Sequence, residues 1–189
     1  LLLRGGGYRT AGYGRALLHE LGNDSGGGRC PRRRHRQAVT GKEYDVNYDL
    51  DRFRRAQRGS YDEALSEIRA GRKNGHWMWY VFPQLSGLGM SATSLYYGIR
   101  SLGEARAYFD DPVLGARLRE ISEALLELST SDASAVFWYP DDLKLRSCMT
   151  LFAAAAPECE TFSRVLSKFF DGKPDEATMR LLSQENGKN

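Results

Sequence analysis

The sequence of 189 residues predicts an all-α fold, an irregular array of about six or seven helices. From Leu50 onward, residues that typically begin and end helices recur at short intervals. No run of alternating Val, Ile, Thr and aromatic residues is long enough for a confident strand, and no Asn-Gly or Asp-Gly turn separates two such runs. Short helices joined by short loops pack as helical hairpins, so we expect an array rather than a long bundle.

The first well-marked helix follows Ser60. Ser60 and Glu63 fit a capping box, in which the hydroxyl and the carboxylate each accept a hydrogen bond from a backbone N–H group. Apolar residues at positions 64, 65 and 68 then form a stripe for burial. Gly71 is expected to end this helix.

Two further helices begin at similar signals. Ser101 and Glu104 repeat the capping pattern. Asp111 stands as an N-cap before Pro112 in the first turn of a helix expected over 113–128, which should be the longest. Its buried face would carry Leu114, Leu118, Ile121, Leu125 and Leu128.

Three helices complete the array. Asp141 is expected to cap a helix that runs up to Pro157. The next helix covers about residues 158–170 and ends at Gly172, and Asp175 caps the last helix, which continues through position 182.

Composition divides the chain into two parts. Its length and its 41% hydrophobic content suit one domain, expected over 46–185. Residues 1–45 hold ten of the twenty glycines and the basic run 32–36, so we expect a disordered or non-native arm there. The arm has nine Lys and Arg against four Asp and Glu, whereas 46–189 has eighteen against twenty. Nucleic-acid binding is therefore not expected except through the basic arm.

The remaining composition indicates a cytoplasmic protein. Cys30, Cys148 and Cys159 form no C-x-x-C pair and no zinc-like spacing, which suits a reducing compartment. The N-terminal leucines are too few for a secretion signal. The uncharged stretch 74–99 is as long as a membrane span, but its polar residues and glycines would be penalised in hydrocarbon, so no membrane is expected.

No cofactor or metal is expected. Gly41 and Lys42 do not belong to a phosphate-binding loop, because Arg36 stands where a glycine is needed and Glu43 where Ser or Thr is needed. No histidine and carboxylate stand at the spacing of metal ligands.

The uncharged stretch contains the aromatic segment 76–84, HWMWYVFPQ. Its apolar residues would surround a helix on all sides, so most of its rings are expected in the core, with a ligand-binding wall as the alternative. His76 and Gln84 fit the core reading less well, because each needs hydrogen-bond partners if buried and each suits a polar ligand.

A second cluster lies on the helix expected after Pro140. Helical spacing places Lys144 within one turn of Asp141, Ser147 and Cys148. A cation so close could lower the pKa of Cys148 and make its thiol reactive. In the alternative, Asp141 caps the helix, Lys144 is solvated, and the two small residues make a helix contact.

These segments closely resemble the domain-of-unknown-function 1810 family, which is sometimes labelled calpastatin-like. The resemblance covers about residues 48–182 and rests on GHWMWYVFPQLSGLGMS, on Leu50-x-x-Phe53-x-x-Ala56-Gln57 and on the run 141–152. It implies a mainly helical, α-horseshoe-like fold and no assigned activity. The signature positions it implies are His76, Trp77, Trp79, Phe82, Pro83, Gln84, Asp141, Lys144, Ser147, Met149 and Thr150.

The chain departs from the family pattern at two positions. Trp138 stands where the family usually has a glycine, which puts the local turn in question. Cys148 stands where the family usually has a second serine, which argues against a thiol as a required nucleophile.

We therefore expect the aromatic segment and the Asp-x-x-Lys helix to form one pocket for a small anionic or nucleotide-like ligand. The alternative is a protein-interaction module that binds a protein partner on a concave helical surface. Whether a reaction is catalysed stays open, and His76 would be the default acid or base. The expected ligand-binding residues are His76, Trp77, Trp79, Gln84, Asp141, Lys144 and Ser147.

Overall fold

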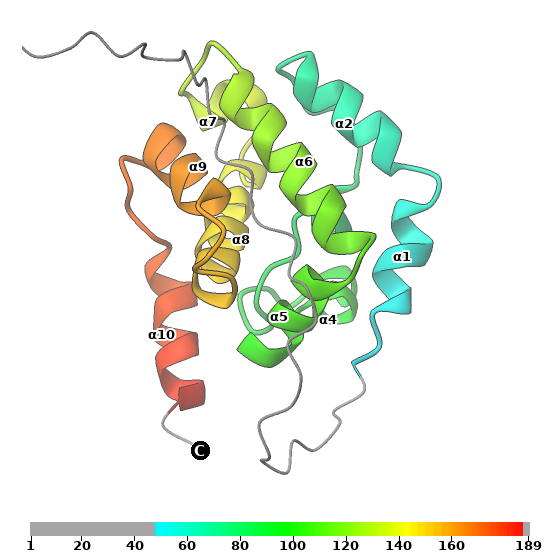
Figure 1. Cartoon of the computed structure of the whole chain (residues 1–189), viewed down its shortest axis with the longest axis vertical. Coiled ribbons are helices and arrows are strands. Elements are labelled where there is room, and N and C mark those ends of the chain that lie inside the picture. Colours follow the sequence, from blue (N-terminus) through cyan, green and yellow to red (C-terminus); the bar gives the residue numbers. More distant parts are fainter. Residues whose placement is uncertain (1–47, 187–189) are drawn as a thin grey trace, which may run out of the picture.

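The computed structural model of the chain describes residues 48–186, and the arm expected over 1–45 lies outside them. These residues form ten helices and no β-strand, which confirms the all-α prediction (Figure 1). The helices are α1 Asp51–Gln57, α2 Tyr61–Arg69, α3 Met78–Val81, α4 Ala92–Tyr97, α5 Leu102–Asp110, α6 Leu114–Glu127, α7 Ala133–Val136, α8 Asp141–Ala155, α9 Thr161–Phe170 and α10 Glu176–Asn186.

The helices that the sequence marks clearly are the longer ones. The six that the sequence marks correspond to α2, α5, α6, α8, α9 and α10, which contain nine or more residues, whereas α1, α3, α4 and α7 contain seven, four, six and four. Segments of one or two turns are too short to show a clear helical repeat, so sequence patterns do not reveal these four. The prediction that the helix over 113–128 is the longest was wrong, because α6 has 14 residues and α8 has 15.

The predicted helix caps are partly confirmed. Ser101 accepts a hydrogen bond from the backbone N–H of Glu104, and Asp175 accepts one from that of Thr178. Ser60 accepts no such bond, and its hydroxyl donates to a carbonyl of the preceding helix. Asp141 is the first residue of α8 rather than its cap, and its carboxylate is used elsewhere.

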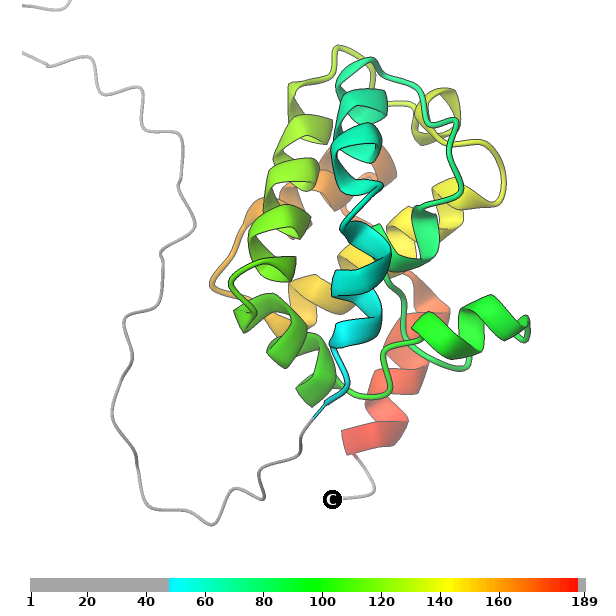
Figure 2. The same ribbon diagram turned by 90° about the vertical axis from the view of Figure 1, so that its right-hand side faces the viewer.

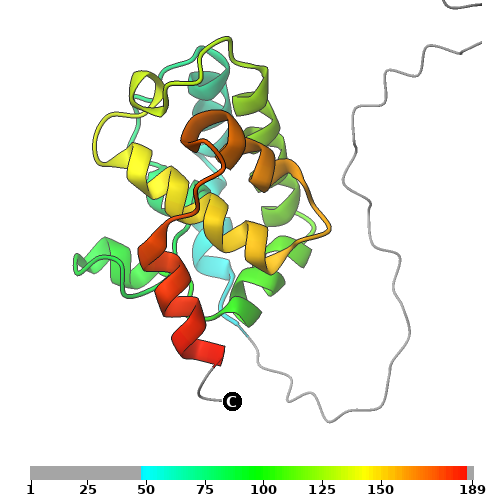
Figure 3. The same cartoon turned by 90° about the vertical axis from the view of Figure 1, so that its left-hand side faces the viewer.

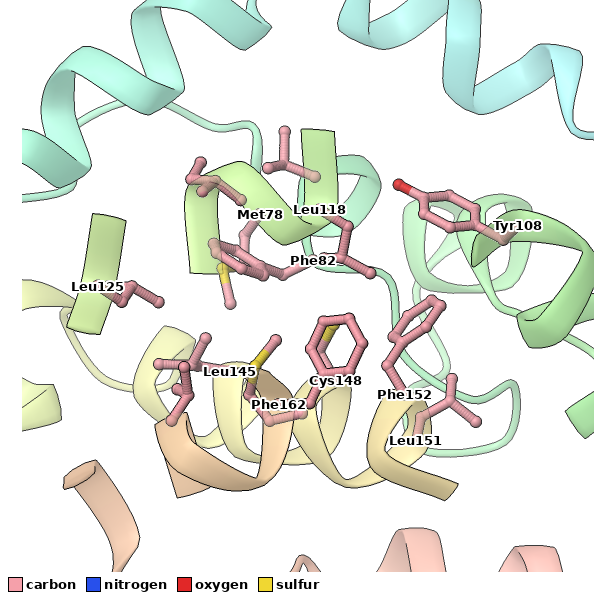
Figure 4. Packing of buried hydrophobic residues seen from close by; sticks show 14 of the residues in the cluster. Met78, Phe82, Tyr108, Leu118, Leu125, Leu145, Cys148, Leu151, Phe152 and Phe162 are labelled. Atoms are coloured by element: carbon pink, nitrogen blue, oxygen red, sulfur yellow. The ribbon is translucent and has the colours of Figure 1, made fainter. Parts of the chain in front are cut away.

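Helix α8 lies at the centre of the core. It packs against α5, α9 and α10, while α6 packs against α2, α5 and α9. Figure 4 shows side chains of α8 pointing toward Phe82 and Tyr108. The Phe152 ring lies between those of Tyr108 and Phe162, with ring centres 5.4 and 5.7 Å away. The aromatic packing joins α5, α8 and α9 into one core.

A buried ion pair holds α1 against α5. The Arg52 guanidinium lies 2.7 Å from Glu104, and only 3% and 1% of these side chains are exposed. Arg52 also donates to the carbonyl of Gly98, and Glu104 accepts from the backbone N–H of Arg100. The pair therefore fixes the chain that leads from α4 into α5.

Two segments project on one side of the molecule. Figures 2 and 3 agree in placing α4 and the connection between α7 and α8 on the side that faces away from the viewer in Figure 1. None of the described helices is long and apolar enough to cross a membrane.

Candidate functional site

A carboxylate shared by two lysines lies at the start of α8. One oxygen of Asp141 is 2.8 Å from the Lys144 ammonium, one turn along the same helix. The other oxygen is 2.7 Å from the ammonium of Lys73, which comes from the connection between α2 and α3. The three side chains are largely buried, with 8% of Lys73 and 19% of Lys144 exposed.

Charge contacts determine the ionisation of Asp141. Burial by itself would raise the pKa of its carboxyl group, but the hydrogen bonds and positive charges of Lys144 and Lys73 outweigh this effect. The pKa therefore lies below the ordinary value, and the carboxylate stays ionised at neutral pH.

Sequence reasoning missed Lys73. Its backbone N–H donates to the carbonyl of Val136 at 2.9 Å, and its ammonium also donates to the carbonyl of Gly75. The long-range contact with Asp141 leaves no periodic signal in the sequence. The only available hint is that Lys73 is the last charged residue before the uncharged stretch.

Trp79 and Trp77 have different roles. The Lys144 ammonium lies 3.9 Å from the centre of the half-buried Trp79 ring, a close cation–π contact. Trp77 is 1% exposed, and its indole N–H donates to Glu67 at 2.9 Å. The structure therefore places Trp77 in the core, where a ligand could reach it only by displacing neighbouring side chains.

Glu67 fixes the turn that carries Lys73. Its carboxylate accepts hydrogen bonds from the backbone N–H groups of Asn74 and Gly75 as well as from Trp77. Burial by itself would raise the pKa of Glu67, but these three hydrogen bonds and the nearby Lys73 charge lower it overall. An ionised Glu67 thus holds the α2–α3 connection beside α8.

Each of the three tryptophans in the chain has a cation beside its ring. Lys73 lies 5.1 Å from the Trp77 ring centre, and Lys144 lies over Trp79 as described above. The Arg72 guanidinium lies 4.9 Å from the Trp138 ring centre. Both cations of the α2–α3 connection therefore contact indoles, and one of them, Lys73, also contacts the Asp141 carboxylate.

Among the described residues, the side chains of Gln84, Ser147 and His76 make no hydrogen bond or ion pair with Lys144. The buried Gln84 side chain donates to the carbonyl of Phe82, and the buried Ser147 hydroxyl donates to that of Leu143. The His76 side chain is exposed. The hypothesis of a reactive Cys148 was wrong, because burial raises the pKa of this thiol well above its ordinary value.

A hollow beside Trp79 is smaller than the expected pocket. Its volume is about 10 Å³, enough for one water molecule. Neither Asp141 nor Lys144 is among its lining residues, which are Trp79, Gln84, Leu85, Leu88, Gly89, Ser94, Tyr97 and Gly98. Trp79 alone connects this hollow with the charged cluster, so the candidate site is a surface rather than an enclosed pocket.

Metal binding finds no support in the part of the chain that the structure describes. Within residues 48–186, no three His, Cys, Asp or Glu side chains come together as a group that could hold a metal ion.

Comparisons with known proteins identify a family and a solved structure that are similar to this chain, and neither description names an activity. A family described as "Protein of unknown function (DUF1810)" matches residues 47–182. The chain resembles a solved crystal structure, that of the conserved hypothetical protein Rv1873 from Mycobacterium tuberculosis, with 46% sequence identity. The similarity covers 72% of this chain and 97% of that one, with a TM-score of 0.71. Among curated proteins, no match was found.

Proposed function

The chain belongs to the DUF1810 family of proteins of unknown function, and we propose that it binds a small anionic ligand where Lys144, Asp141 and Trp79 meet. The observation that carries the proposal is the sharing of one carboxylate by two ammonium groups. Asp141 supplies one negative charge to both ammonium groups, and the nearby ionised Glu67 supplies a second one on the Lys73 side only. Lys144 therefore shares its only carboxylate partner among the described residues with another cation.

Lys144 is the cation that a ligand can reach. Among the described residues, its ammonium makes one hydrogen bond, to Asp141, although an ammonium has three N–H donors. It is also more exposed than Lys73. A carboxylate or phosphate oxygen can accept from the remaining donors, and hydrogen bonds between charged groups are the stronger kind.

The surroundings hold this ammonium in place before a ligand arrives. Asp141 fixes it on one side and the Trp79 ring on another. A side chain that is already ordered loses less conformational entropy on binding. The i,i+3 pair itself contributes only about 0.2–0.5 kcal/mol to stability, so folding alone does not account for the arrangement.

The proposal includes a cytoplasmic location and assigns no reaction. Cys148 and Cys159 are free, buried thiols, which is consistent with a reducing compartment. No reaction is proposed because the only imidazole among the described residues, that of the exposed His76, has no hydrogen bond or ion pair with Asp141 or Lys144.

The test compares ligand binding by two lysine variants of the full chain. Inorganic phosphate, ribose 5-phosphate and AMP are titrated by isothermal calorimetry against the wild type and Lys144→Met. Loss of a charged hydrogen bond should weaken binding about tenfold or more. Lys173→Met is the matched control, because Lys173 is exposed and contacts a different carboxylate, that of Asp171. Equal affinities in all three proteins, or no binding of any probe at millimolar concentrations, would refute the proposal.

A second candidate function is protein binding through α4. Met90, Leu95 and Tyr96 are 85%, 56% and 55% exposed, and α4 projects from the body of the molecule (Figure 2). Clustered exposed apolar side chains are typical of interaction surfaces. A photo-crosslinking amino acid at position 95 should trap a discrete partner that the same group at the exposed Met179 does not trap. Identical crosslinking patterns from the two positions would exclude this candidate.

A further inference from the structure

We infer that the site prefers ligands that join an aromatic ring to the anionic group, as nucleotides do, and that Trp138 holds that ring. This inference rests on the proposed function and deepens it. It assigns a binding role to a residue that neither the aromatic segment nor the Asp-x-x-Lys helix includes.

Trp138 stands in the turn that leads into the first turn of α8, three residues before Asp141. Its carbonyl accepts a hydrogen bond from the backbone N–H of Asp141 at 2.6 Å, so the turn 138–141 carries both side chains. The bond between the Lys73 N–H and the Val136 carbonyl holds the α2–α3 connection against the same segment. The indole is therefore joined to the cluster through short, ordered stretches of backbone on both sides.

Most of the Trp138 ring is accessible. The side chain is 62% exposed, whereas its neighbour Phe137 is completely buried in the core. The Phe137 ring packs in the core, whereas the larger Trp138 indole stays in contact with solvent. Tyr139 is also exposed, at 80%. Two adjacent exposed rings in the turn before α8 provide surfaces on which a planar group can stack.

Arg72 orients the exposed indole. Its guanidinium lies 4.9 Å from the Trp138 ring centre, within the range of a cation–π contact. This contact restricts the ring and places a positive charge beside it. A ligand with a phosphate at Lys144 and a base on Trp138 would thus meet a cation and a π surface that are already ordered.

Nucleotides fit this combination better than other small anions do. A phosphate or carboxylate alone would use Lys144 and leave the indole unoccupied. Every nucleobase has a face that can stack, so the site would gain affinity from the base without reading its identity. Lys144 and Trp138 should therefore contribute separately, the first to all anions and the second to those that carry a ring.

The test separates the two contributions with a matched pair of ligands. AMP and ribose 5-phosphate carry the same phosphate and sugar, and only AMP has a base. For the wild-type full chain we expect AMP to bind about tenfold more tightly than ribose 5-phosphate. Trp138→Ala should reduce AMP affinity to that of ribose 5-phosphate and leave the latter unchanged. Trp138→Phe should retain most of the preference, and Met179→Ala, which truncates an exposed side chain on α10, should behave as wild type.

Tryptophan fluorescence gives an independent readout. Trp138 is the most exposed of the three indoles, so AMP should quench emission at long wavelength in the wild type and not in Trp138→Phe. Equal affinities of AMP and ribose 5-phosphate in the wild type, or an equal loss of both in Trp138→Ala, would overturn the inference while leaving the proposed function intact. Failure of both ligands to bind at millimolar concentrations would overturn the two together.

Discussion

The Lys73 ammonium lies 2.7 Å from the Asp141 carboxylate, which ties the connection between α2 and α3 to the first turn of α8. Lys73 should therefore matter more for stability than Lys144, although both contact the same carboxylate. Replacing Lys73 by Met removes hydrogen bonds from a largely buried group, and we expect a loss of about 1–3 kcal/mol in the free energy of unfolding. Urea unfolding at pH 7 measures it.

Lys144→Met is the comparison for this prediction. Asp141 keeps Lys73 in that variant, so the loss should be no more than about 0.5 kcal/mol. A larger loss for Lys144→Met than for Lys73→Met would show that Lys144, not Lys73, secures the start of α8.

Stability should fall on acidification partly because of Asp141. Its pKa in the folded protein lies below the ordinary value of 3.8, so the ionised form stabilises the fold above that value. This contribution is lost as pH falls below about 4 and through the lower folded-state pKa. Asp141→Asn should lose less stability than the wild type between pH 5 and pH 3 in urea unfolding. Parallel pH profiles for the two proteins would contradict the assignment.

Arg52 and Glu104 should be coupled strongly. Removing one member leaves the other charge buried, so Arg52→Met or Glu104→Gln alone should cost about 3–5 kcal/mol. The double variant should cost clearly less than the sum of the two single variants, which a double-mutant cycle in urea measures. Strict additivity would mean that the pair contributes through separate contacts, such as those to Gly98 and Arg100.

Gly115 should not tolerate a side chain. A Cβ atom there would lie 1.8 Å from the carbonyl oxygen of Phe109, and that contact is with backbone. Gly115→Ala should therefore destabilise the fold by about 1–3 kcal/mol or more, because α5 and α6 must separate. Gly59→Ala is the matched control, since a Cβ there meets nothing within 4 Å. Thermal unfolding should leave the control within a few degrees of the wild type, and a similar loss in both variants would refute the steric explanation.

Local spacing explains how much of the fold could be predicted. The Ser101 and Asp175 caps and the proximity of Asp141 to Lys144 depend on residues three apart in a helix, so the sequence contains them. The split between buried Trp77 and half-buried Trp79 could not be predicted, because α3 is one turn long and its periodicity is not defined.

Tertiary contacts explain what the site prediction missed. Lys73 meets Asp141, and Arg72 meets Trp138, across more than sixty residues of sequence. The resemblance to the family pointed to Asp141 and Lys144 but treated Trp138 only as a departure. That departure supplies the exposed indole, so the residue that fitted the pattern least is the one to which a specific role is now assigned.

The hydrogen bond from the Lys73 backbone N–H to the Val136 carbonyl offers a way to detect ligand binding at Lys144 by hydrogen exchange. An anion that accepts from the remaining donors of Lys144 would hold that ammonium more firmly, and with it the Asp141 carboxylate that Lys73 shares. The Lys73 amide should then exchange its hydrogen with deuterated water more slowly. A single backbone proton would thus report occupancy without a label or a substitution, whatever the chemical identity of the bound molecule.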